Sequence, residues 1–162
     1  MMVLEISLAA VVSFFTTMLL LVVYSILDLR DRKVENELIL ASGFVGVVVT
    51  ILTGHLATNI ILHTTAVFLT IPLVYVLLLI GSIGGADAKA LCIIALVSPG
   101  IEFGDWNQPI LEVIIGLGGE LLIMLVGGYL LWRAIRKLEH ATPPLLPFLL
   151  VGYLLVQIFA LF

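Results

Sequence analysis

The feature that most constrains this chain is a succession of apolar runs. Hydrophobic side chains make up 62 % of its 162 residues and charged ones 11 %, against roughly a quarter charged in ordinary globular proteins. The apolar windows cover residues 6–27, 38–53, 60–80, 88–100, 110–132 and 145–162. Because a helix needs about 20 apolar residues to cross a bilayer, we interpret the chain as an all-α polytopic membrane protein with six transmembrane helices.

The basic residues provide a test of the number of spans. All seven lie in or beside the first, third and fifth connections between windows, and none lies in the other two. They are Arg30, Arg32, Lys33, Lys89, Arg133, Arg136 and Lys137. Positive residues favour the cytoplasmic side of a membrane, so the sequence predicts an N-out/C-out topology. The window at 88–100 is short for a span, yet this alternation of charge requires it to cross.

The rest of the composition narrows the classes of function. With no internal repeat and no low-complexity linker, residues 1–162 are expected to form a single transmembrane domain. One cysteine, Cys92, excludes a disulfide framework and a Cys-rich zinc module. No His/Glu cluster with metal-ligand spacing is present beside the aspartates discussed next, so no metal is expected there.

Two aspartates lie directly beside apolar windows, where a charged side chain requires an explanation. Asp28 follows the first apolar window, and Asp87 follows the stretch "GSIGGA" and precedes the fourth window. The predicted topology places both at the cytoplasmic face, and ionisable groups at such depth are functional candidates. Each could instead lie at the water interface, capping a helix or pairing with a neighbouring base such as Arg30.

If the two carboxyls approach each other, like-charge repulsion keeps one protonated while the other stays ionised. One carboxylate can then activate a water while the neutral acid binds a scissile carbonyl. This is the chemistry of an aspartic protease, and it needs no nucleophilic side chain.

The residues around the aspartates have competing explanations. Gly84 and Gly85 leave room for an extended peptide beside Asp87. Lys89 either acts on Asp87 or a substrate carbonyl, or it extends to the lipid headgroups as an anchor. Asn36 caps the second helix by default, or it orients the pair.

At these residues the sequence resembles the type IV prepilin peptidases, particularly the small archaeal preflagellin and prepilin peptidases, which are GxGD-type membrane aspartic proteases. Three stretches carry the resemblance: "DLRDRKVENEL" from residue 28, "GGADAK" from residue 84 and "TPPLLPFLLVG" from residue 142. Glu35 stands where many relatives have proline, and Ala86 where many have glycine. These departures bear on loop detail and leave both aspartates in place.

The resemblance implies that Asp28 and Asp87 are the catalytic pair of an aspartic endopeptidase. Its substrates would be prepilin or preflagellin precursors, cut at the cytoplasmic face between a short basic leader and an apolar helix. The zinc module linked to N-methyltransferase activity in large bacterial members is absent here, so proteolysis without methylation is expected. The implied partners are the precursor and the lipid bilayer; no cofactor and no nucleic acid is expected.

Other side chains have simpler explanations. Asp31, Glu35 and Glu37 could attract a positive leader, but balancing the neighbouring bases is favoured, because surface charge pairs are common and individually weak. Tyr24, Trp106 and Trp132 fit the aromatic belts at membrane edges.

Two alternatives remain open at this point. A small proton- or ion-coupled transporter could use Asp28, Asp87 and Glu120, although transporters usually show repeats or broken helices near the midplane. A protease of the presenilin or signal-peptide-peptidase sort would cut within the bilayer, but the proline-alanine-leucine motif of that group is missing.

Overall fold

The structure, a computed structural model, describes residues 7–103, 108–135 and 143–159. In these ranges all regular structure is helical, so the all-α prediction is confirmed for them. The helices are α1 (Leu8–Asp31), α2 (Asn36–Leu52), α3 (His55–Thr58), α4 (Ile60–Ile80), α5 (Gly85–Val97), α6 (Pro109–Ile135) and α7 (Leu146–Phe159). Each predicted apolar window carries one of the longer helices, and α3 is a single additional turn between α2 and α4.

Helix length and composition identify the clearest membrane spans. Within the described residues, α1, α4 and α6 are long and apolar enough to cross a membrane. The apolar helices α2 and α7 have only 17 and 14 residues. The 13 residues of α5 extend about 20 Å at 1.5 Å per residue, which is less than the roughly 30 Å hydrocarbon thickness of a bilayer.

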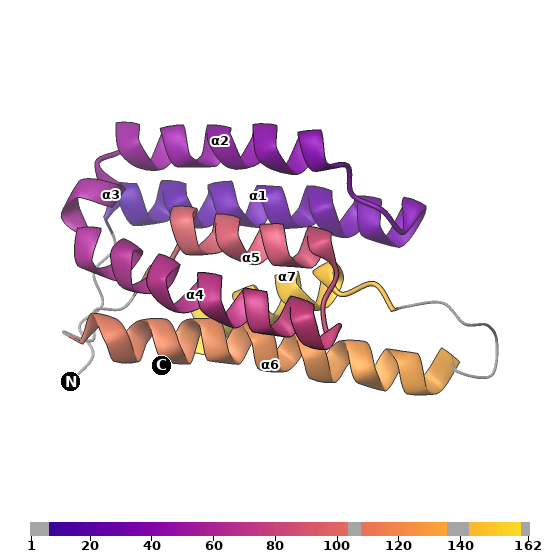
Figure 1. The fold of residues 1–162 in the computed structure, drawn as a ribbon. Helices are drawn as coiled ribbons and strands as arrows, with labels where there is room; N and C mark the ends of the chain where they lie inside the picture. Colours follow the sequence, from indigo (N-terminus) through magenta and orange to yellow (C-terminus); the bar gives the residue numbers. More distant parts are fainter. Residues whose placement is uncertain (1–6, 104–107, 136–142, 160–162) are drawn as a thin grey trace.

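The longer helices run in alternating directions along one bundle (Figure 1). The α1–α2 and α4–α5 connections and the C-terminal end of α6 lie at one end of it, which we call the basic end. The described basic residues lie there: Arg30, Arg32, Lys33, Lys89 and Arg133. The turn α3 lies at the opposite end, which we call the far end. Arg136 and Lys137 of the predicted fifth connection, and Trp106 of the predicted fourth, lie outside the described residues.

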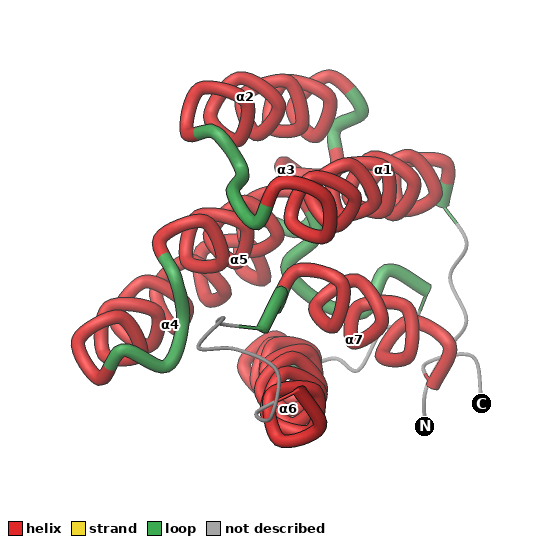
Figure 2. Tube along the Cα trace, turned by 90° about the vertical axis from the view of Figure 1, so that its right-hand side faces the viewer, coloured by secondary structure: helices red, strands yellow, loops and turns green. Residues whose placement is uncertain are grey.

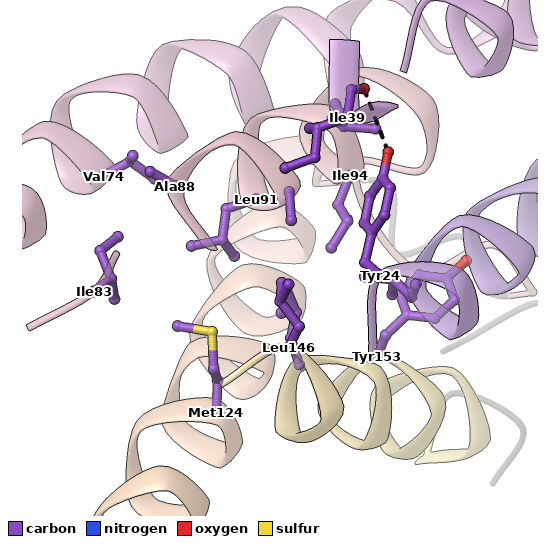
Figure 3. Close-up of a cluster of buried hydrophobic side chains, with 14 of the residues drawn as sticks. Tyr24, Ile39, Val74, Ile83, Ala88, Leu91, Ile94, Met124, Leu146 and Tyr153 are labelled. Carbon is purple, nitrogen blue, oxygen red and sulfur yellow. Dashed lines mark hydrogen bonds between the residues drawn. The ribbon is translucent and has the colours of Figure 1, made fainter. Parts of the chain in front are cut away.

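The central helix of the bundle is α5. It packs against α4, α2 and α1, while α7 packs against α6 and α1; Figure 2, seen along the bundle, shows α7 between those two helices. Eight of the 13 residues of α5 are buried. Its Ala88, Leu91 and Ile94 belong to the same hydrophobic cluster as Leu146 of α7 (Figure 3).

Two glycines allow α2 to approach α5 closely. A Cβ atom added to Gly43 would lie 2.6 Å from Ile93 Cδ1, and one added to Gly46 would lie 2.9 Å from Val97 Cγ2. Small residues at such contacts let membrane helices pack backbone against side chain. The glycines therefore fix the position of α5 relative to α2.

Tyr24 corrects one prediction, because it lies in the core and not in an aromatic belt. Its side chain is buried, and its hydroxyl lies 2.6 Å from Ser42 Oγ and donates to the Ile39 carbonyl at 3.4 Å (Figure 3). The packing of α2 against α1 covers this tyrosine.

Candidate active site

A cavity of about 880 Å³ lies at the basic end. Figure 1 shows that α5 begins short of the ends of α1 and α6 there, and the first turn of α5 lines the cavity. The cavity is lined by the end of α1, by residues 32–34 and Asn36, by residues 81–87 and Lys89, by α6, and by the lead-in to α7. Of the predicted site residues, the lining includes Asp28, Asn36, Gly84, Gly85, Asp87 and Lys89.

Asp87 is held by its own helix. It is the third residue of α5, and its Oδ2 accepts a hydrogen bond from the N–H of Gly84, the N-cap, at 2.8 Å. The N-terminus of a helix favours negative charge. Asp87 precedes the apolar part of α5, residues 88–97. Burial raises the pKa of Asp87 to about 6; the Gly84 hydrogen bond opposes this effect and the negative charge of Asp28 adds to it.

Asp28 is held by a different helix. It lies in the last turn of α1, which ends where Arg32 adopts a left-handed conformation with φ of 53°. Asp28 Oδ2 accepts a hydrogen bond from the backbone N–H of Leu146, the first residue of α7, at 3.2 Å. The first N–H groups of a helix have no partner within it, so the carboxylate satisfies one of them.

The structure therefore brings the two aspartates into one cavity, each bound to a helix N-terminus. Asp28 and Asp87 also act on each other electrostatically. Such a pair can share one proton and exchange acid and base roles with water. Within the described ranges, no three His, Cys, Asp or Glu side chains are placed to hold a metal ion.

The glycines beside Asp87 differ in what surrounds them. A Cβ atom on Gly84 would lie 3.1 Å from Asp87 Oδ2, whereas one on Gly85 would meet nothing within 4 Å. Both glycines are exposed and line the cavity. Gly84 thus keeps the carboxylate close to the backbone, and Gly85 leaves open space beside it.

Asn36 and Lys89 interact with each other. Lys89 Nζ donates to Asn36 Oδ1 at 2.5 Å, which joins the first turn of α5 to the first residue of α2. The N-cap of α2 is Glu35, without a side-chain capping bond, so the capping role predicted for Asn36 is wrong. Because α2 packs against α5, the ammonium group reaches the amide, and Lys89 is more than a lipid anchor.

The predicted acidic residues of the first connection lie elsewhere. Asp31, Glu35 and Glu37 are exposed and do not line the cavity. Asp31 Oδ1 lies 3.5 Å from Arg30 Nε, the kind of surface pair expected for charge balancing.

A buried polar network at the far end was missed by the sequence analysis. His55 Nε2 lies 2.9 Å from Glu102 Oε2, and Ser13 Oγ donates to Glu102 Oε1 at 2.8 Å. His55 Nδ1 lies 3.1 Å from His63 Nε2. A second cavity, of about 470 Å³, is lined in part by His55 and Glu102. The available signal was a carboxylate, Glu102, just after an apolar window.

Comparison with known proteins gives one match. The sequence model of the Type IV leader peptidase family matches residues 14–161, a range that contains both aspartates and every residue lining the cavity. No curated protein and no solved structure matches the chain.

Proposed function

Because the chain belongs to the type IV leader peptidase family, a family of proteases, we propose that it is an aspartic endopeptidase whose catalytic pair is Asp28 and Asp87. The observation that carries the proposal is that both carboxyls line a single cavity of about 880 Å³, although they come from distant parts of the sequence. In such a pair the ionised carboxylate supplies the base and the protonated carboxyl supplies the acid that peptide hydrolysis needs.

In the proposed reaction, the ionised aspartate removes a proton from a water while the neutral one donates a hydrogen bond to the scissile carbonyl. The water oxygen bonds to the carbonyl carbon and forms a tetrahedral intermediate. Delivery of a proton to the amide nitrogen then breaks the C–N bond, and the carboxyls exchange roles. The pKa of Asp87, raised to about 6 by burial, suits the neutral role at mildly acidic pH.

The proposed substrates are prepilin or preflagellin precursors, cut between a short basic leader and the apolar helix. We place the site at the cytoplasmic face and both termini outside, since the described basic residues lie at the same end of the bundle as the cavity and positive residues favour the cytoplasm. The whole chain would act as one peptidase domain, without methylation of the product.

All six longer helices would cross the membrane in this arrangement. The short α5 can do so because α1, α2 and α4 pack around it. Irregular backbone at membrane depth is tolerated where it is buried in protein or lines a cavity, as residues 81–84 do.

The test is cleavage of a pilin or archaellin precursor by the purified protein in liposomes. Asp28→Asn and Asp87→Asn keep the side-chain shape and remove the acid/base group, so each should lower the rate by at least about 10²-fold. Asp31→Asn, outside the cavity, is the matched control and should retain most of the activity. Substantial cleavage by either cavity variant would remove that aspartate from the chemistry. If the wild type cuts neither precursor, aspartate-dependent ion flux into the liposomes is the next measurement.

A further inference from the structure

The apolar wall of the cavity is one face of α6. Leu125, Gly128, Tyr129 and Trp132 all line the cavity, and their spacing of i, i+3, i+4 and i+7 places them on one side of a helix. We call these four residues the α6 stripe. It extends about 10 Å along the helix axis.

The aromatic members of the stripe line the cavity and are only partly covered by the rest of the protein. Tyr129 is 57 % exposed and Trp132 is 37 % exposed. Their ring centroids lie 6.1 Å apart with planes at 32°, so the two rings form one continuous surface. Burying such a surface against an apolar ligand is favourable by about 25 cal/mol per Å².

The rest of the cavity wall differs in character from the stripe. It carries both aspartates together with three basic side chains, Arg32, Lys33 and Lys89. A peptide lying between these walls would place its polar backbone toward the aspartates, and its apolar side chains would gain most from contact with α6.

The direction of the stripe matches the path of a membrane-inserted substrate. Because α6 is long and apolar enough to cross a membrane, the stripe leads from the basic end toward the apolar layer. Once the scissile bond of a precursor lies between the aspartates, the apolar helix that follows this bond has to extend in the same direction, because it is held in the bilayer.

We propose that the α6 stripe is the subsite for the residues directly after the scissile bond, with Tyr129 and Trp132 as its specificity-determining contacts. The ligand is the first turn of the precursor's apolar helix, and a large apolar or aromatic side chain is preferred at its start. Helices bind apolar surfaces through anchors with the same i, i+3, i+4 spacing. The inference rests on the proposed function, since it assigns the orientation of the substrate in that site.

The experiment uses two precursors that differ only in the residue after the scissile bond, phenylalanine in one and alanine in the other. For each, kcat and KM are measured with the purified protein in liposomes. Trp132→Ala and Tyr129→Ala should lower kcat/KM for the phenylalanine precursor by about 10-fold, mainly through KM, and change it for the alanine precursor by less than about 2-fold. Trp132→Phe retains a ring and should preserve most of the discrimination.

Leu130→Ala is the matched control. Leu130 is adjacent to Tyr129 in α6 and is 56 % exposed, but it does not line the cavity. It should leave the ratio of the two kcat/KM values as in the wild type.

Equal losses on both precursors would overturn the subsite and assign the rings a structural role. A loss of discrimination in Leu130→Ala as large as in Trp132→Ala would overturn it as well. Failure of the wild type to cut either precursor would reject the proposed function itself, so the two failures are distinguishable within one experiment.

Discussion

The backbone N–H of Leu146 donates a hydrogen bond to Asp28 Oδ2 at 3.2 Å, across a sequence separation of 118 residues. The start of α7 thus holds the carboxylate at the end of α1. Gly84 does the same for Asp87 at the start of α5. Both candidate catalytic groups depend on the placement of a helix N-terminus, so packing changes along α7 should affect Asp28.

Gly152→Ala tests this dependence. Gly152 is a buried residue of α7, and a Cβ atom there would lie 3.0 Å from Glu120 O and 3.1 Å from Glu120 Cα. Backbone atoms cannot rotate away, so α7 must shift relative to α6. We expect a loss of about 1–3 kcal/mol in the free energy of unfolding, measured by denaturation in detergent. The cleavage rate should fall by more than the increase in the unfolded fraction accounts for.

Gly118→Ala is the control for that substitution. Gly118 lies in α6, and a Cβ atom there would meet nothing within 4 Å. This variant should be as stable as the wild type or slightly more so, because alanine has the higher helix propensity. Similar losses in Gly118→Ala and Gly152→Ala would contradict the steric explanation.

Asp87 should make stability depend on pH. Its pKa is about 6 in the folded protein, against 3.8 for an ordinary aspartate, chiefly because of burial. Between these two values the unfolded chain releases the proton while the folded protein retains it, so stability falls as pH rises. The Tm of the wild type should therefore decrease relative to that of Asp87→Asn between about pH 4 and pH 6. Parallel Tm curves would show that burial of Asp87 does not control its ionisation.

The bond between Lys89 and Asn36 should contribute to the docking of α5 on α2. Lys89→Met keeps the length of the side chain and removes the donor, so we expect the free energy of unfolding to fall by about 1 kcal/mol. A double-mutant cycle with Asn36→Leu measures the coupling directly. If the two losses simply add, the 2.5 Å contact contributes nothing to stability.

Glu102→Gln should affect stability without affecting catalysis. The side chains of His55 and Glu102 are only 4 % and 2 % exposed, and a buried hydrogen bond to a charged group contributes about 2 kcal/mol. Because the network lies at the far end, kcat per folded molecule should stay the same. A change in kcat with unaltered Tm would instead show coupling between the two ends of the bundle.

Much of this arrangement could be predicted from the sequence because it depends on position along the chain. The window at 60–80 coincides with α4, since this mainly apolar run ends at Gly81, whose φ of 74° suits glycine. The alternation of basic residues also predicted that the end of the first window and the start of the fourth lie on the same side. That placement is sufficient to bring Asp28 and Asp87 to one end of the bundle.

What could not be predicted depends on helix rotation. Helices that are apolar on all sides give no periodic signal for the face that turns inward. The burial of Tyr24, the Lys89–Asn36 contact and the pairing of His55 with Glu102 all follow from rotation and from contacts between distant segments. The same uncertainty kept Tyr129 and Trp132 from being assigned to the cavity.

The short length of α5 sets the position of Asp87 along the bundle axis. Each helical residue advances 1.5 Å, so one additional turn of about four residues would move Asp87 roughly 6 Å along the bundle while keeping it on the same face. Asp28 would keep its position, because it belongs to α1 and is hydrogen-bonded to α7. In the proposed enzyme, the number of residues in α5 therefore decides at which level relative to the membrane surface a precursor is cut, and a relative that cuts at another level would need a helix of another length with the same two aspartates.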